Sequence, residues 1–293
     1  LEGSVEHAQE RGWLLYRVGR LVRSADAAKG VAFLVEAERV GRALGDPVLA
    51  AFARFDRGTI LCIGGEIARG LAAMEQGDAA LAALPAAARS RADVAAWIAD
   101  SLPDPNRAST DRGEAAAPAD VHPRRGTLAF WLALAGRFAE ARAVAEAYLS
   151  RMATTDRLDA IGRASTGDAS IGLGLVEAAW GRPEAAATAL EQALRAYRAI
   201  GHHMLEAVTV DLLLTGVVLA YQTTRTAERR RLLAEAEAAF AQARGALAAG
   251  LPRRLFWAYE VLLLDGAWAT ARDDALRARD QGDATARFYA TAA

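Results

Sequence analysis

The residues best suited to metal binding or nucleophilic chemistry are one histidine pair, His202 and His203, and one cysteine, Cys62. Neighbouring residues of a helix point in different directions, so joint metal ligation by the two imidazoles would need a turn and additional carboxylates. We therefore interpret the histidine pair as a solvated turn. Cys62 lies in the apolar run Ile60–Ile63 without a second cysteine, which favours a small buried side chain over a disulfide or a thiolate zinc site.

Motifs of well-defined enzyme chemistry are absent from the sequence. It contains no GxxxxGK[ST] phosphate loop, no GxSxG nucleophile turn and no HExxH zinc helix. The segment 162–174 is rich in glycine and serine, but no strand precedes it, as a phosphate loop would require. The sequence thus predicts a protein that is not an enzyme and that needs no cofactor or metal.

The charged residues are balanced and dispersed. The formal net charge is −1, and basic residues alternate with acidic ones along the chain, which argues against direct nucleic acid contact. The densest basic runs are Glu228–Arg231, Arg124–Arg125 and Arg253–Arg254. We interpret them as solvated faces, with contact to an acidic partner as the alternative for the first run.

The elements that would position any site are predicted to be helices throughout. Apolar residues recur at helical spacing, while aromatic residues make up only 7% of the chain and prolines number eight. The class is therefore all-α. The predicted helical segments are 5–22, 26–44, 48–84 with a turn at Gly64–Gly65, 86–102, 127–149, 170–200, 204–221, 226–247, and a last pair beginning at 250–252.

Two of these segments share a sequence pattern that indicates a repeat. A turn glycine, Gly136, is followed five residues later by the small residue Ala141, and Gly181 and Ala186 repeat this arrangement 45 residues on. A glycine permits a tight turn, and a small residue permits close approach of two helices. We expect each pattern to form a helical hairpin.

This pattern of a leucine–glycine pair, a turn glycine and spaced alanines resembles the tetratricopeptide repeat (TPR). The resemblance implies an α-solenoid of TPR-like hairpins with a right-handed superhelix. The spacing departs from the usual period of ~34 residues. The small residues lie 40, 71, 45 and 85 residues apart, at Gly30, Gly70, Ala141, Ala186 and Ala271. Long alanine-rich units of this kind resemble the TPR-like region of large bacterial MalT/LuxR-type ATPase transcriptional regulators.

The predicted domain organisation is a single TPR-like solenoid over residues 1–293. It comprises N-terminal hairpins plus an extra helix in 1–102, a long loop in 103–126 and C-terminal hairpins in 127–293. The loop has low hydrophobicity, which favours disorder, with a binding loop as the alternative. The missing initiating methionine suggests a piece of a longer chain.

The resemblance also implies a binding face, because the first helix of each TPR hairpin lines the inner groove. Either this face is an open groove that receives an amphipathic helix or an apolar ligand, or it is packed against the rest of the superhelix. The residues assigned to it are Phe55, Thr59, Phe130, Leu134, Ile171, Leu175, Val217, Tyr221, Phe256 and Glu260.

The function predicted from this resemblance is that of a non-enzymatic module that binds a protein segment or a small effector, as the sensor or scaffold region of a bacterial regulator. One alternative is a TPR scaffold attached to a cyclase or kinase, and another is a helical enzyme with a site in the groove. No apolar run reaches the ~18 residues of a transmembrane helix, and no signal peptide is recognisable, so we expect a cytoplasmic protein without membrane contact.

Overall fold

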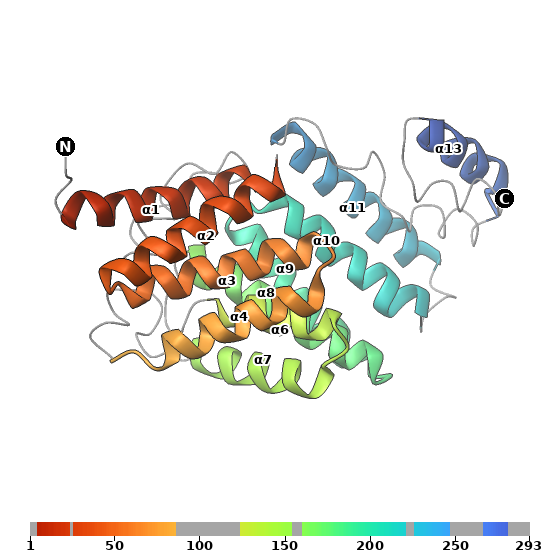
Figure 1. Ribbon diagram of the computed structural model, residues 1–293. Coiled ribbons are helices and arrows are strands. Elements are labelled where there is room, and N and C mark those ends of the chain that lie inside the picture. The colour runs from red at the N-terminus through yellow and green to blue at the C-terminus, as the bar shows by residue number, and fades with distance from the viewer. Residues whose placement is uncertain are drawn as a thin grey trace. The chain divides into compact units, whose positions relative to one another are not determined.

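The computed structural model of the protein describes residues 5–23, 26–85, 124–153, 160–220, 226–246 and 266–280. All regular elements in these ranges are helices, which confirms the predicted all-α class (Figure 1). In this described part, no helix is long and apolar enough to cross a bilayer. The helices are α1 Val5–Val22, α2 Ala27–Leu44, α3 Pro47–Ile63, α4 Ile67–Ala82, α6 Arg125–Leu134, α7 Phe138–Met152, α8 Ala160–Ala179, α9 Pro183–Ala199, α10 His203–Leu213, the π-helix η1 Leu214–Leu219, α11 Thr226–Ala246 and α13 Trp268–Asp280.

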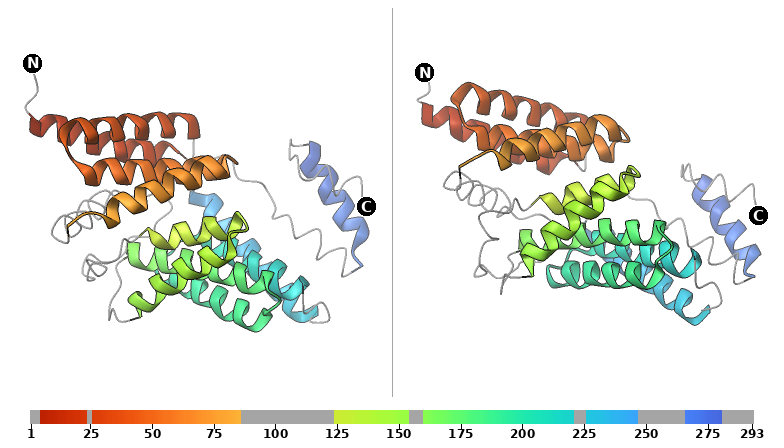
Figure 2. Two further views of the ribbon diagram at one scale, coloured as in Figure 1. Left: turned by 60° about the horizontal axis from the view of Figure 1, so that its bottom comes forward. Right: turned by 90° about the horizontal axis from the view of Figure 1, so that it is seen from below.

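Helices that follow one another in the chain pack against one another. In the first of two compact units, which takes in the described residues up to Val176, α1 packs on α2, α2 on α3, α3 on α4, and α4 on α6 (Figure 2). In the second unit, α10 packs between α9 and α11. Such neighbour-to-neighbour packing is typical of helical repeats. The continuation of the hairpins from one unit to the next as a right-handed solenoid stays a prediction.

Five of the turns between described helices share one backbone geometry. Each of the five has a glycine with a positive φ between 64° and 87°, a region that other residues rarely adopt. In each, the glycine N–H donates to the carbonyl three residues back, and the next residue's N–H donates to the carbonyl five residues back. These paired bonds satisfy the last carbonyls of the preceding helix. The turn glycines are Gly45, Gly65, Gly136, Gly181 and Gly201.

Two helix starts carry residues that are typical of helix N-termini. Asp26 accepts a hydrogen bond from the backbone N–H of Lys29 at 3.0 Å, and Asp46 caps α3 in the same way, with Pro47 at its first position. Asp accepts a hydrogen bond from a backbone N–H that has no partner within the first turn, and Pro already has the φ that the first helical position needs. These helix boundaries can therefore be predicted from the local sequence.

Glycines inside the helices allow the N-terminal hairpins to close tightly. A Cβ on Gly30 would lie 3.0 Å from the carbonyl oxygen of Gly19 across the α1–α2 contact. A Cβ on Gly70 would lie 2.6 Å from the carbonyl oxygen of Gly58 across the α3–α4 contact. The small residues Gly30 and Gly70 therefore mark close helix approach, as predicted. Tyr16, Leu34, Leu49 and Phe52 fill the adjoining core.

Four features differ from the prediction or lie outside the described residues. The helix α8 begins at Ala160, ten residues before the predicted segment 170–200. The predicted loop ends earlier than expected, because Arg125 already belongs to α6. The predicted uninterrupted helix over 204–221 contains a π-helical segment, Leu214–Leu219. The helix predicted over 86–102 and the first helix of the last pair lie outside the described ranges.

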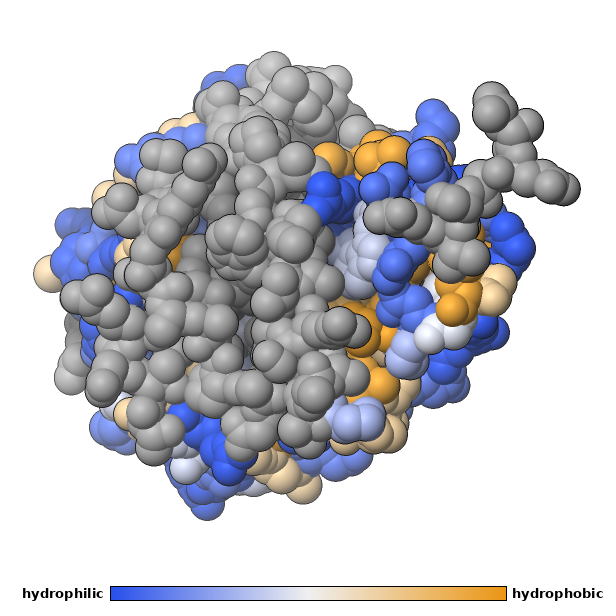
Figure 3. Space-filling view, turned by 90° about the vertical axis from the view of Figure 1, so that its left-hand side faces the viewer, coloured by the Kyte–Doolittle hydropathy of each residue, from blue (hydrophilic) through white to orange (hydrophobic). Residues whose placement is uncertain are grey.

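Exposed apolar side chains are few and separated on the described surface. Figure 3 shows small orange groups set among hydrophilic residues on one face. The large apolar residues that are exposed are Leu14, Leu21, Val35, Ile63, Leu134, Trp180 and Trp268. Scattered single residues of this kind need no functional explanation, but one that borders a cavity does.

Ala141 and Ala186 test whether the small positions hold the hairpins together. Both are fully buried, whereas Ala139 is exposed. We expect Ala141→Leu and Ala186→Leu each to lower the free energy of unfolding by about 1–3 kcal/mol, because an enlarged side chain must separate the helices or take a strained rotamer. Urea unfolding followed by circular dichroism measures the loss. Ala139→Glu serves as the control, and equal stability of all three variants would contradict the assigned hairpin register.

Candidate functional site

Four of the predicted binding-face residues lie inside the packed helices. Phe55 and Ile171 are at most 1% exposed, and Val217 is also buried. The Thr59 hydroxyl donates to the carbonyl oxygen of Phe55 on its own helix, at 3.4 Å. At these four positions the structure corresponds to the packed alternative rather than to an open groove.

The remaining predicted residues are divided between partly exposed positions and undescribed ones. Phe130 and Leu175 are half-buried. Leu134, the last residue of α6, is 48% exposed. Tyr221, Phe256 and Glu260 lie outside the described residues. Leu134 is thus the one predicted residue that the described structure places on an accessible apolar surface beside a cavity.

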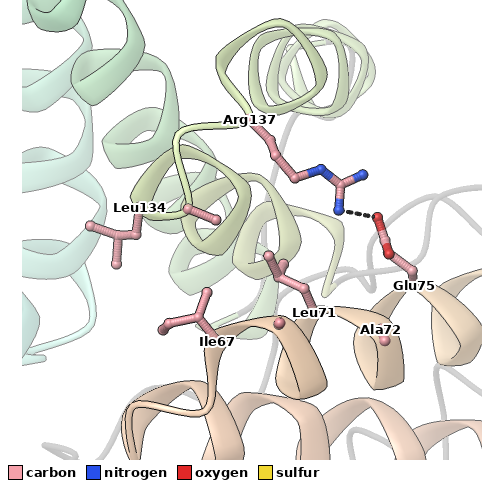
Figure 4. A pocket seen from close by; sticks show the side chains of 8 residues that line it. Ile67, Leu71, Ala72, Glu75, Leu134 and Arg137 are labelled. Carbon is pink, nitrogen blue, oxygen red and sulfur yellow. Dashed lines mark ion pairs between the residues drawn. The ribbon is translucent and has the colours of Figure 1, made fainter.

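That cavity has a volume of about 550 Å³ and lies between α4 and the turn from α6 to α7 (Figure 4). We call it the α4–α6 groove. Ile67, Ala68, Leu71 and Ala72 come from α4, one helical turn apart in pairs, so they form a continuous strip. Leu134 and Ala135, at the end of α6, line the other side of the cavity. The volume is in the range of ligand pockets, ~300–1,000 Å³.

One ion pair closes an end of the α4–α6 groove. Nη1 of Arg137 lies 2.7 Å from Oε1 of Glu75, and the Arg137 Nε donates to Glu140 at 2.7 Å. The pKa of Arg137 is raised above its usual value, chiefly by the hydrogen bond to Glu140 and also by Glu75. The groove therefore combines an apolar floor with a fixed polar boundary, an arrangement that orients a bound segment rather than a reacting group.

Groups for covalent or metal chemistry are not assembled around this groove. Burial raises the pKa of the Cys62 thiol to about 11, so the thiol rather than the nucleophilic thiolate is the form present near neutral pH. In the described part of the chain, no three His, Cys, Asp or Glu side chains are placed to hold a metal ion. His202 instead caps α10, accepting from the backbone N–H of Leu205.

A buried carboxylate, Asp56, is the centre of a charged network in the first unit. Its side chain is 1% exposed and lies 2.8 Å from Nη1 of Arg124 and 3.3 Å from Nε of Arg20. The Tyr16 hydroxyl donates to Asp56 at 2.7 Å and accepts from Arg124 at 2.9 Å. Arg124 is only 12% exposed. The interpretation of Arg124 as part of a solvated basic run in a loop is therefore wrong.

Arg125 makes a second ion pair of the same kind. Its Nε lies 3.1 Å from Oδ1 of Asp78, which is largely buried on α4. Two residues further along α6, the Thr127 hydroxyl donates to Asp168 of α8 at 2.6 Å. The start of α6 is thus tied by polar contacts to α4 and α8, which fixes the helix that carries Leu134.

The basic run Glu228–Arg231 is also more buried than predicted. Arg229 is 4% exposed, and Arg231 pairs with Glu228 and with Glu235 at 2.6 and 2.7 Å on the same helix. The prediction of a fully solvated face is therefore wrong at Arg229. Arg253 and Arg254 lie outside the described residues.

Sequence reasoning missed Ile67, Leu71, Glu75 and Arg137 as groove residues. The sequence contained a partial signal for the groove. Ala68 and Ala72 are small and lie beside Ile67 and Leu71, so the four residues form an apolar strip that a neighbouring helix does not have to cover. The missing information was which helix packs opposite.

Comparison with known proteins places the chain in no group. No protein-family model matches it, and no curated protein is significantly similar to it in sequence.

Proposed function

We propose that this chain is a non-enzymatic binding module that receives an amphipathic helix of a partner protein in the α4–α6 groove. The observation that carries the proposal is the exposed Leu134 facing the apolar strip of α4 across an accessible cavity. A helix that docks in such a groove inserts apolar side chains spaced three or four residues apart.

The polar boundary of the groove supports a protein segment over an apolar small molecule. Glu75 and Arg137 present an ion pair at one end, where a helix can place polar residues beyond its last apolar anchor. The volume of about 550 Å³ suits a few apolar side chains rather than a whole helix, which would lie over the groove and insert its anchors.

The TPR resemblance supports a wider proposal about context. In this proposal the module is the sensor or scaffold region of a bacterial transcriptional regulator and acts in the cytoplasm. The shared turn geometry and the packing of successive helices support the repeat character on which the resemblance depends. The adjoining coding sequence tests this context: an ATPase phosphate loop and a helix-turn-helix in the same reading frame are the expected features.

Leu134→Glu tests the groove. Peptides with helical patterning are selected from a displayed library against the whole chain, and their affinity is measured by fluorescence anisotropy. We expect the selected peptides to carry apolar residues at helical spacing and to bind the Leu134→Glu variant at least about tenfold more weakly, because a charge replaces an apolar contact worth about 1.5 kcal/mol or more.

Leu21→Glu provides the matched control, since Leu21 is a similarly exposed leucine of α1 that does not line the α4–α6 groove. Its affinity should equal that of the unaltered chain. Selected peptides that bind all three proteins equally, or a library that yields no specific peptide, would refute the proposed function.

A further inference from the structure

A second cavity, of about 350 Å³, is lined by four arginine side chains of the N-terminal helices. We call it the arginine cavity. The α2 helix contributes Val35, Glu38, Arg39 and Arg42 to its wall, and α3 contributes Arg54 and Arg57. Gln76 of α4 completes the lining. All these residues belong to the first unit.

One buried carboxylate holds three of the arginines in place. Glu38 is 4% exposed, and its Oε1 lies 2.7 Å from Nη2 of Arg54 while its Oε2 lies 2.8 Å from Nη1 of Arg57. Arg42 also pairs with Oε1. Arg54 and Arg57 are about three-quarters buried, so their guanidinium groups are fixed before any ligand arrives.

The charges of the cavity do not balance. A single bidentate arginine would satisfy one carboxylate, yet Glu38 has three arginine partners. Arg39 pairs through two nitrogens with Glu36, at 2.7 Å each. The four guanidinium groups of the cavity therefore have two carboxylate partners, and one of these, Glu36, also lies 4.0 Å from Arg11. The site carries an excess of at least two positive charges.

The arginines also retain unused hydrogen-bond donors. A guanidinium has five N–H groups. Arg54 donates its Nε to Glu38 at 2.9 Å, while its Nη2 and the Nη1 of Arg57 make ion-pair contacts to Glu38 at 2.7 and 2.8 Å. Close guanidinium groups repel one another, and an anion that accepts these N–H groups removes the repulsion. The repulsion among the arginines therefore destabilises the protein without an anion more than it destabilises the protein with an anion bound.

We propose that the arginine cavity binds the phosphate group of a small phosphate monoester. A phosphate dianion matches the excess of two charges, and its oxygens match the planar forks of arginine. The Gln76 amide adds a neutral donor, and the exposed Val35 at the edge offers apolar contact to the carbon part of the ester. This site is separate from the α4–α6 groove and takes a different class of ligand.

Calorimetric titration of the whole chain at low ionic strength tests the proposal with phenyl phosphate, inorganic phosphate and phenylacetate. Phenyl phosphate should bind most tightly, followed by inorganic phosphate. Phenylacetate, a monoanion of similar size, should bind at least about tenfold more weakly than phenyl phosphate, because it leaves one positive charge and several N–H groups without a partner.

Arg57→Gln should weaken phenyl phosphate binding at least about tenfold. Glu38 keeps Arg42 and Arg54 as partners in this variant, so the fold should persist, and thermal unfolding checks that it does. Should Arg57→Gln fail to fold, Arg42→Gln replaces it, since Arg42 is 60% exposed. Arg142→Gln, at a surface ion pair of α7, is the control and should leave the affinity unchanged.

Three results would overturn the proposal. The first is a titration in which phenyl phosphate does not saturate the protein at concentrations up to about 10 mM. The second is phenylacetate binding as tight as that of phenyl phosphate. The third is an equal loss of affinity in the cavity variant and in the Arg142→Gln control, which would show diffuse attraction to the surface. None of these results bears on the proposed helix-binding function of the α4–α6 groove, because that proposal depends on Leu134.

Discussion

Asp56→Asn should lower the free energy of unfolding by about 3–5 kcal/mol, the largest effect that we expect from a single substitution in this chain. The substitution removes a negative charge while keeping the side-chain volume. Arg20 and Arg124, which are 19% and 12% exposed, would then face a neutral amide in a largely buried site. A buried charge without a partner destabilises the fold by more than the intact ion pair stabilises it.

Urea unfolding of Asp56→Asn, Arg124→Gln and the double variant measures this effect. The two single losses should not add, because both variants break the same interaction, and a coupling energy of about 0.5–3 kcal/mol is expected. Glu146→Gln, which breaks an exposed pair with Arg142, is the control and should change stability by less than about 1 kcal/mol. An Asp56→Asn loss as small as that of the control would show that the network does not stabilise the fold.

Gly70→Ala should cost about 3 kcal/mol, although alanine favours a helix more than glycine does. Its Cβ would lie 2.6 Å from the carbonyl oxygen of Gly58 and 2.8 Å from the backbone nitrogen of Cys62. Both are main-chain atoms, so no rotamer change relieves the overlap and α3 and α4 must separate. The free-energy cost of overpacking is then larger than the gain in helix propensity, which is up to about 1 kcal/mol.

Gly64→Ala is the matched control on the same hairpin. Gly64 has φ −75°, and the atoms nearest to its added Cβ lie 3.5 Å away, an ordinary contact distance. Its stability should stay within about 0.5 kcal/mol of the unaltered chain. Midpoints of urea unfolding decide the comparison, and a Gly70→Ala variant as stable as Gly64→Ala would mean that close approach of α3 and α4 is dispensable.

The local parts of the fold could be predicted from the sequence. Turn glycines such as Gly136 and Gly181 are recognisable because only glycine adopts a positive φ at little cost, and the cap at Asp46–Pro47 is recognisable for equally local reasons. Hairpin positions follow from these turns and from helical periodicity, without knowledge of distant contacts.

Burial across helices could not be predicted in the same way. Arg124 and Arg125 have the composition of a solvated loop, and their partners Tyr16 and Asp78 lie 108 and 47 residues away in sequence. The α4–α6 groove depends likewise on which helix packs opposite α4. A partial signal existed, since Asp56 lies one turn after Phe52 and one before Ile60 on an apolar face, where a charge must find a buried partner.

The π-helix explains why the register of the predicted binding face is least secure near Val217. The sequence Leu214–Leu219 is mostly apolar and does not distinguish a π-turn from an α-turn. A π-turn accommodates an extra residue, so side chains after it are rotated relative to a continuous α-helix. Assignments for Val217 and Tyr221 assumed that continuity.

The ion pairs of Arg124 and Arg125 couple completion of the N-terminal core to the progress of translation. A ribosome adds ~5–20 residues per second, so the roughly 40 residues between Ala82 and Arg124 take about 2–8 s to synthesise. During that interval the helices α1 to α4 have emerged, while Asp78 lacks Arg125 and Asp56 lacks Arg124. Until the segment with Arg124 and Arg125 leaves the ribosome, Asp78 is without Arg125, and the partners of Asp56 are Arg20 and Tyr16 of α1. The ion pairs that join the start of α6 to α3 and α4 can therefore form only after a much later segment has been made.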